Sequence, residues 1–510
     1  MSSTVRVRFA PSPTGPLHIG GVRTALYNYL FAKKHSGTFI LRIEDTDQKR
    51  YVPNAEQYIV DALDWCGIPF DEGPKGAKSK GSFGPYRQSE RKHLYRKYAD
   101  ILIDKGWAYF AFDTPEQLSL HRKKNEENGE TFIYNWHNRK AGELMNSLVL
   151  SKEEVQEKIN AGQDYVIRFK SPKDEILTLN DEIRGTIKID TNTLDDKVIF
   201  KSDGMPTYHL ANVVDDHLME ISHVIRGEEW LPSLSLHVLL YKAFEWEVPL
   251  FAHLPLILKP TGKGKLSKRD GDQLGFPVFP LSYFDEKTRD VSRGYREEGY
   301  FSDAFINMLS LLGWNPGTTQ EIFSLNELIE VFDLSRVSKS GAKFNLEKTR
   351  WFNQQYLQQK DNSLLAESLL LFLSKKNIYP KKKYVEKVIS LIKERAFFIS
   401  DFWVIGAFFF EAPRSFDQKA SRKKWKENTG IIMNDLAHII LSINNFISSN
   451  IESKVKAWIT EQNMGFGSVM QPLRLSLVGA LHGPHLFDII EMIGKEETIT
   501  RIQHAIKELS

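Results

Sequence analysis

The sequence predicts an α/β protein in which a parallel sheet covered by helices is split by an insertion and followed by an all-helical C-terminal region. Three observations predict this fold. Strand and helix patterns alternate over residues 5–65 and return after about residue 198. The residues between them, 85–194, are more polar and less regular. From about residue 326 onward strand patterns fade and long amphipathic stretches follow one another, as in helical bundles.

Length and composition indicate a multidomain globular chain. Its 510 residues are too many for a single hydrophobic core. Of these residues, 41% are hydrophobic and 26% are charged, and the net charge is +3. No run of about 18 apolar residues occurs, so no membrane span is expected. The single cysteine, Cys66, excludes an internal disulfide and a multi-thiolate zinc site. With no basic-then-apolar leader, these features favour a cytoplasmic protein.

The first predicted element is a strand, a turn and a helix. Residues 5–9 alternate apolar and basic side chains, as a strand does, and an amphipathic helix pattern follows the turn. The Pro/Gly-rich turn Pro11–Gly21 is expected to present bare backbone N–H groups and the positive helix end to an anion. A phosphate is expected to approach Gly20 and Gly21 closely and to accept a hydrogen bond from His18.

The other elements follow in chain order. A second strand over 39–44 and a helix over 54–65 continue a β-α-β-α order, which predicts ligands at the carboxyl ends of the strands. A loop is expected at 125–129 within the insertion. Further strands are predicted at 198–202, 224–225 and 254–258, and further helices from 207 and over 234–244, 364–373, 385–395 and 431–447.

A second basic motif lies at Gly262–Arg269. Its glycines indicate a mobile loop, and Lys265, Lys268 and Arg269 concentrate positive charge on it. Such side chains stabilise phosphate oxygens whose charge grows as pyrophosphate leaves. Alone, the motif is more typical of a solvated basic loop. Together with the turn Pro11–Gly21, it indicates a nucleotide site.

These two motifs give the chain a resemblance to class I aminoacyl-tRNA synthetases, and within them to the glutamyl-tRNA synthetase family. Pro11–Gly21 is similar to the first nucleotide motif of the class and Lys265–Arg269 to the second. The wider class has a second His where this chain has Gly21, and glutamyl enzymes commonly lack it as well. Further similar stretches extend the likeness over nearly the whole chain: Ile43–Asp47, Gly84–Glu90 and Pro206–His217.

The resemblance implies a domain order and a reaction. A Rossmann-type catalytic domain would comprise 1–84 and 195–270, an acceptor-stem-binding domain 85–194, a helical stem-contact domain 271–360 and a helical anticodon-binding region 361–510. The implied partners are ATP with Mg²⁺, L-glutamate and tRNA(Glu). No zinc ion is expected, and the chain is expected to be a monomer. The glutamate carboxylate would attack the α-phosphorus of ATP, and the terminal ribose of tRNA would then take the glutamyl group.

The amino-acid pocket is predicted from charge. Glutamate carries two carboxylates and one ammonium, which are costly to bury without partners. Arg8 and Arg226, each at the carboxyl end of a strand, suit the side-chain carboxylate, and Glu44 suits the ammonium. A neutral amide cannot satisfy two arginines, so glutamine is expected to be excluded. The full glutamate-binding set is Arg8, Ala10, Ser12, Glu44, Tyr208, Asn212 and Arg226.

The resemblance implies the remaining site residues. His18, Lys265 and Lys268 are the expected catalytic residues. No metal site is expected. The ATP-binding set is Pro11, Gly15, His18, Gly20, Gly21, Glu228, Trp230, Leu256, Lys265, Ser267, Lys268 and Arg269. The expected tRNA contacts are Arg50, Arg395, Arg474 and Phe487.

Several alternatives stay open at this point. An enzyme that loads glutamate onto a modified nucleoside of tRNA would lack the helical C-terminal region, and a glutaminyl enzyme would have a β-rich one. A non-catalytic relative would have lost residues such as His18 or Lys268, and a small-molecule nucleotidyltransferase would leave the insertion and the bundle unexplained. Whether the enzyme would charge only the glutamate tRNA or the glutamine tRNA as well depends on a few anticodon contacts. The stretch 272–299 is longer than the resemblance predicts and would be either a packed surface insertion or a lid or interface.

Overall fold

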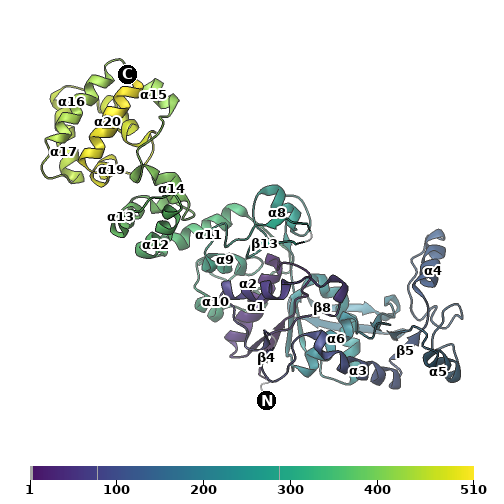
Figure 1. The fold of residues 1–510 in the computed structure, drawn as a ribbon. Helices are drawn as coiled ribbons and strands as arrows, with labels where there is room; N and C mark the ends of the chain where they lie inside the picture. The colour runs from purple at the N-terminus through teal and green to yellow at the C-terminus, as the bar shows by residue number, and fades with distance from the viewer. Residues whose placement is uncertain (1–3, 77, 287) are drawn as a thin grey trace. The chain divides into compact units, whose positions relative to one another are not determined.

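The computed structural model describes residues 4–76, 78–286 and 288–510, which form two compact units (Figure 1). The first unit is Met1–Glu298 with Ser302–Leu346, and the second is Gly299–Phe301 with Glu347–Ser510. The break after Leu346 precedes the boundary that we predicted at 360. The first unit is α/β and the second is helical, which confirms the predicted fold class.

Parallel strands form the centre of the first unit. Strand β1 (Arg6–Phe9) pairs in parallel with β2 (Thr38–Leu41), and β10 (His223–Gly227) pairs in parallel with β11 (Leu250–Leu254). The amide of Ser222, just before β10, donates to the carbonyl of Arg6 and so ties the two sheets together. The carboxyl ends of β1 and β10 therefore lie close to each other, as the β-α-β-α order predicts.

Two strands of the predicted insertion belong to the central sheet. Strand β7 (Ile176–Asp181) pairs in parallel with β11, and β8 (Gly185–Asp190) pairs antiparallel with β7, which gives the order β10-β11-β7-β8. The polar, irregular sequence of 85–194 concealed this, because both strands have exposed alternate residues. The insertion therefore contributes directly to the sheet that carries Arg226.

The rest of the insertion forms a smaller antiparallel sheet with helices. The sheet has the order β5-β6-β9, and Figure 1 shows α4 and α5 near its β5 end. The loop predicted at 125–129 is wrong, because α4 is helical up to Glu127. Thr114 and Gln117 form a capping box at the start of that helix, with Pro115 in its first turn. This cap fixes where α4 begins, although the helix buries no residue. The elements are α3 (Lys92–Asp104), β5 (Ala108–Ala111), α4 (Pro115–Glu127), α5 (Lys152–Asn160), β6 (Val166–Phe169) and β9 (Val198–Phe200).

The helices of the α/β core lie where the sequence predicts them, within a few residues. The strand predicted over 254–258 is wrong: β11 ends at Leu254, and Pro255, which has no N–H for a ladder, separates it from β12 (Ile257–Leu258). Strand β12 pairs with β15 (Ala342–Lys343). The predicted helices are α1 (Ile19–Lys34), α2 (Ala55–Trp65), α6 (Tyr208–Leu218) and α7 (Leu234–Phe244). Two further helices, α9 (Ser302–Ser310) and α10 (Leu325–Val331), were not predicted.

The long stretch 272–299 packs against the first two helices. After α8 (Lys268–Leu274) it forms a short hairpin of β13 (Tyr283–Phe284) and β14 (Val291–Ser292). The carbonyl of Leu281 accepts a hydrogen bond of 2.5 Å from the hydroxyl of Tyr58 on α2, and that of Val278 accepts one from the first amide of α1. The base of this segment is therefore part of the core.

The second unit consists of helices around two apolar cores. One core lies among α11 to α14, and the other among α15 to α20 (Figure 1). The helix predicted over 431–447 stops at Leu441, and the one over 385–395 ends at Ile392 before a 3₁₀ turn. The helices are α11 (Leu346–Gln359), α12 (Asn362–Ser374), α13 (Lys382–Ile392), α14 (Asp401–Gly406), α15 (Gln418–Lys424), α16 (Thr429–Leu441), α17 (Ser448–Glu461), α18 (Phe466–Val478), α19 (Leu486–Ile493) and α20 (Lys495–Leu509).

No helix in the described ranges combines the length and the apolar character that crossing a membrane would require.

Close backbone packing at Gly294 gives a test of the 272–299 segment. A Cβ there would lie 2.1 Å from the carbonyl carbon of Leu281, so Gly294→Ala is expected to destabilise the hairpin by about 1–3 kcal/mol. Hydrogen exchange of residues 279–286 and 288–294 would report this as faster exchange. Arg293→Ala, which removes an exposed ion pair at the neighbouring position, is the control and should change little. Equal exchange in both variants would contradict the packing.

Candidate active site

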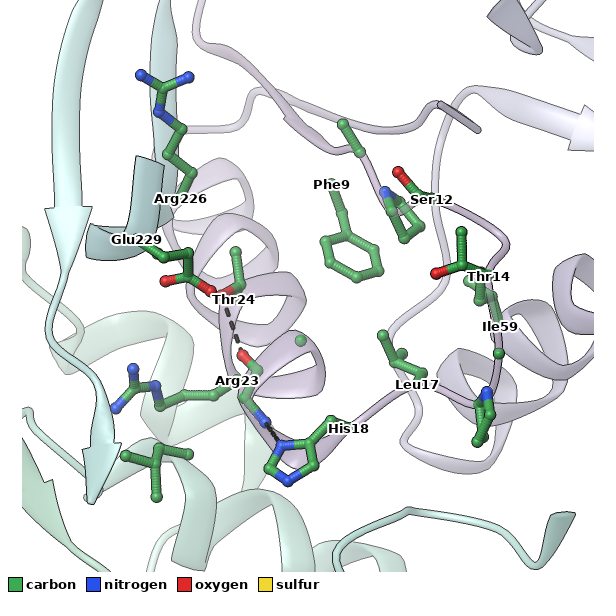
Figure 2. A pocket seen from close by; sticks show the side chains of 18 of the residues that line it. Phe9, Ser12, Thr14, Leu17, His18, Arg23, Thr24, Ile59, Arg226 and Glu229 are labelled. Carbon is green, nitrogen blue, oxygen red and sulfur yellow. Dashed lines mark hydrogen bonds between the residues drawn. The ribbon is translucent and has the colours of Figure 1, made fainter. Parts of the chain in front are cut away.

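A cavity of about 940 Å³ opens at the carboxyl ends of β1 and β10. In Figure 2, Arg226 and Glu229 lie on one side of it, while Ser12, Thr14 and Leu17 lie on the other. Glu228 and Arg269 of the predicted sets do not line it. The predicted residues that do are Arg8, Ala10, Pro11, Ser12, Gly15, His18, Gly20, Gly21, Glu44, Arg50, Tyr208, Asn212, Arg226, Trp230, Leu256, Lys265, Ser267 and Lys268.

The first turn of α1 does not offer the bare amides that we predicted. The amide of Ile19 donates to the carbonyl of Val278 at 2.9 Å, and that of Gly20 donates to Nδ1 of His18 at 3.2 Å. The next two amides donate to the carbonyl of His18. The sequence could not show this, because the donor of Ile19 is taken by a residue far away in the chain. An anion here would meet side-chain donors and the helix dipole instead.

The two glycines of the turn have different roles. A Cβ on Gly21 would lie 2.5 Å from Cδ1 of the buried Leu17, so a side chain at this position would have to displace Leu17. A Cβ on Gly20 would meet nothing closer than the His18 ring at 3.6 Å. Only Gly20 therefore leaves open space on the cavity side, as the sequence predicts for both.

The position of His18 as the N-cap of α1 determines which ring nitrogen carries the proton. Since Nδ1 accepts from the amide of Gly20, the proton of the neutral ring lies on Nε2 (Figure 2). Among the residues that the structure describes, none hydrogen-bonds to this buried Nε2. Burial, together with Lys265, lowers the pKa of His18 to about 4. At neutral pH the side chain is thus an uncharged donor that faces no protein partner.

Two arginines and two acids form a buried, charge-balanced cluster at the base of the cavity. Arg8 donates to both oxygens of Asp216 at 3.0 and 3.1 Å, and Arg42 donates to Asp216 at 2.7 Å. Arg42 also donates to Oε1 of Glu44 at 2.9 Å, and Asn212 donates to the same oxygen at 3.0 Å. All four charged side chains are at most 7% exposed. Each charge is therefore held by an opposite one.

The cluster leaves Glu44 ready for a cation. The hydrogen bonds from Arg42 and Asn212 both go to Oε1 of Glu44. Among the described residues, none hydrogen-bonds to Oε2. Burial raises the pKa of Glu44 and outweighs the lowering by Arg42 and Arg8. Burial would also raise the pKa of Asp216, but there Arg42 and Arg8 prevail and lower it. An added ammonium beside Glu44 would therefore favour its ionised form.

Arg226, near the carboxyl end of β10, lines the cavity and is held from several sides. Its Nη1 donates to the hydroxyl of Tyr208 at 2.8 Å, and its Nε donates to Nε2 of His253 at 3.0 Å. Burial raises the pKa of Tyr208 to about 12, so this phenol stays neutral. The ring of Trp230 packs on that of Tyr208 with centroids 4.3 Å apart.

The second basic motif supplies lysines at the other end of the cavity. Ser267 and Asp270 form a capping box that starts α8 at Lys268, so this lysine begins a helix. The Nζ of Lys265 lies 3.0 Å from Glu229, which lines the cavity, whereas we predicted Glu228 for this wall. The carboxylate of Glu228 instead accepts from the Leu256 amide and from Arg184.

The predicted tRNA contacts are spread over the chain. Arg50 is exposed at the cavity rim beside Asp47. Burial and the nearby charge of Arg395 lower the pKa of Arg474, whose Nη1 has no partner among the described residues. Phe487 is 1% exposed and packs in a core of the second unit, so it offers no ring face at the surface.

Sequence reasoning missed the residues behind the site. Asp216 and Arg42 were not singled out, although both lie in stretches that carried the resemblance or adjoin one. The 272–299 segment also contributes: the Phe279 ring meets that of His18 edge-on at 6.1 Å, and Tyr283 lines the cavity. Only the aromatic content of that segment could have suggested this.

The described residues contain no group of three His, Cys, Asp or Glu side chains placed to hold a metal ion.

The buried cluster predicts a strong effect on stability. Arg42→Met would leave Asp216 and Glu44 with one compensating cation between them, so a loss of about 3–5 kcal/mol is expected in the free energy of unfolding. Arg50→Met removes an exposed pair with Asp47 and should cost at most about 1 kcal/mol. Urea unfolding of both variants measures this, and similar midpoints would contradict a structural role of the cluster.

Comparisons with known proteins agree with this geometry. The family described as class I tRNA synthetases (E and Q), catalytic domain, matches residues 4–351, and an anticodon binding domain family matches 364–506. Glutamate–tRNA ligases of Christiangramia forsetii and Flavobacterium johnsoniae are 64% and 63% identical over the full length of both chains.

Solved structures agree as well. A glutamate tRNA ligase from Elizabethkingia meningosepticum, solved in complex with its amino acid, is 54% identical and has a TM-score of 0.97. The match covers 100% of this chain and 100% of that one. The enzyme from Elizabethkingia anophelis has a TM-score of 0.94 at the same identity, with 99% of this chain and 100% of that one covered. The chain belongs to the class I tRNA synthetase family, in its glutamate and glutamine (E and Q) branch.

Proposed function

We propose that the chain is a glutamate–tRNA ligase that activates L-glutamate with ATP and transfers it to the terminal ribose of tRNA(Glu). The observation that carries this proposal is one cavity in which Arg8, Arg226 and Glu44 lie beside His18 and two lysines. Two cations and one anion complement a substrate with two carboxylates and one ammonium. The full-length likeness to glutamate–tRNA ligases supports the same assignment.

The glutamate end of the cavity acts by charge. Arg226 and Arg8 hold the side-chain carboxylate, and the free Oε2 of Glu44 takes the ammonium. Ala10, Ser12, Tyr208 and Asn212 complete this end. Because the Tyr208 hydroxyl is already bound by Arg226, it faces the substrate as an acceptor and donor of fixed orientation. Glutamine would leave a cation without its partner.

The nucleotide end acts by donating hydrogen bonds and positive charge. The Nε2–H of His18 donates to an ATP phosphate, and Lys265 and Lys268 stabilise the pyrophosphate as its charge grows. The orphaned Nε2 of His18 supports this role. Mg²⁺ would arrive on the ATP phosphates and be held mainly by them and by water. Catalysis is then positioning and charge stabilisation, without a covalent enzyme intermediate.

The RNA end of the proposal involves both units. Arg50 lies at the cavity rim, where the tRNA terminus must enter, and Arg395 and Arg474 bring two cations together on the helical unit. Unpaired anticodon bases are where proteins read RNA sequence. Glutamate-specific tRNA is the proposed partner of a monomeric, cytoplasmic enzyme.

The charging reaction tests the proposal. Purified protein with ATP, Mg²⁺ and tRNA(Glu) is expected to attach labelled glutamate, with a kcat/KM for glutamine lower by about a thousandfold or more. Aspartate, one methylene shorter, serves as the second comparison. ATP-dependent charging with glutamine but not glutamate would contradict the assignment, as would no charging at all.

Single substitutions separate the catalytic side chains from their neighbours. His18→Ala and Lys268→Ala are each expected to lower kcat by about 10²–10³ while the melting temperature changes little. Lys263→Ala, in the same basic motif as Lys268 but outside the cavity lining, is the control and should retain wild-type turnover. A His18 or Lys268 variant with normal turnover removes that residue from the proposed mechanism.

A further inference from the structure

Three buried side chains form a row behind the cavity, one from each of three neighbouring strands. Arg226 on β10 and His253 on β11 are direct partners in the strand register, and Asp181 ends β7 on the other side of β11. Nε of Arg226 donates to Nε2 of His253 at 3.0 Å, and Nδ1 of His253 lies 2.6 Å from Oδ2 of Asp181. His253 and Asp181 are closed to solvent, and neither lines the cavity.

The proton positions along this row follow from the partners. An arginine only donates, so Nε2 of His253 must be the acceptor and must carry no proton. Burial lowers the pKa of His253, so the ring is neutral and its proton lies on Nδ1, directed at Asp181. Only one tautomer of His253 therefore fits, and Asp181 selects it.

Asp181 is itself held rigidly. Its Oδ1 accepts the amides of Ile183 and Arg184 at 3.0 and 2.8 Å, and its Oδ2 also accepts the amide of His253 at 3.1 Å. Both oxygens are thus filled by donors of the β7–β8 turn and of β11. The carboxylate cannot rotate away without breaking several hydrogen bonds.

We propose that Asp181 and His253 are positioning residues that set the orientation of the Arg226 guanidinium for the substrate carboxylate. The inference rests on the proposed role of Arg226 in glutamate binding. Nε is fixed by His253, Nη1 by Tyr208 and by Nδ1 of His237 at 3.3 Å, and Nη2 by the carbonyl of Trp230 at 3.3 Å. The guanidinium plane is therefore determined, and the N–H that remains on Nη2 is preorganised for a carboxylate. The inserted segment thereby contributes, through β7, to the choice of amino acid.

Asp181→Asn is the first test. The backbone amides of the turn would keep the amide oxygen of Asn on the Oδ1 side, which leaves its NH₂ facing Nδ1 of His253 and moves the ring proton to Nε2, against the N–H of Arg226. The KM for glutamate is expected to rise about tenfold or more, while the KM for ATP stays within about twofold. Glu182→Gln, an exposed neighbour on the same turn, is the matched control and should match wild type.

Two substitutions of His253 make the test independent of Asp181. His253→Gln can place an amide oxygen near the position of Nε2 and still accept from Arg226, whereas His253→Asn can reach only Asp181. The glutamine variant is expected to recover most of the glutamate KM that the asparagine variant loses. The ratio of kcat/KM for glutamate over glutamine should fall in the asparagine variant and in Asp181→Asn.

The outcomes separate the two proposals. An unchanged glutamate KM in Asp181→Asn and His253→Asn overturns the positioning role, and so does an equal rise in the KM for glutamate and for ATP, which indicates a general structural defect. If instead the wild-type protein charges no glutamate, the proposed function fails, and the positioning role fails with it. Circular dichroism and melting temperatures of each variant show whether the fold is kept.

Discussion

The site depends on charge balance inside a low-dielectric core. Arg8, Arg42, Asp216 and Glu44 are nearly closed to solvent, and no member of this set could remain ionised there without the others. A single uncompensated charge at such a depth costs several kcal/mol even after relaxation. The cluster therefore fixes which side chains surround it, including the amide of Asn212. Of the four charged residues, Arg8 and Glu44 line the cavity, so they are the two that can meet a ligand there.

Fixed orientation is also a property of the His18 end of the cavity. The ring of His18 is oriented by the amide of Gly20 and flanked by the edge of Phe279, so its Nε2–H has a fixed direction before any ligand arrives. A neutral donor of this kind costs no proton transfer when a phosphate binds. Lys265 and Lys268 differ, because they are exposed and a long lysine side chain can follow a phosphate as it moves. Rigid and adaptable donors thus meet in one cavity.

The sequence predicted the elements of the α/β core well, because each carries its own local signal. The apolar stripe of α7 and the Pro/Gly turn before α1 are readable without any tertiary contact, and most residues assigned to the cavity do line it. The failures came from long-range partners. The carbonyl of Val278 takes the amide of Ile19, and two polar-looking strands of the insertion join the central sheet. Likewise, nothing local distinguishes Asp216 as the partner of two arginines or Phe487 as a core residue.

The place of β7 and β8 has a consequence for how such a protein can change. A segment that looks like a detachable module in the sequence holds Asp181 and Arg184, whose contacts reach His253 and Glu228 in the neighbouring strand and turn. Transplanting the whole 85–194 stretch between relatives would therefore exchange these partners of His253 and Glu228 along with it. An exchange that ends between β6 and β7 would leave both contacts in place, whereas one that ends at residue 194 would replace Asp181 and Arg184.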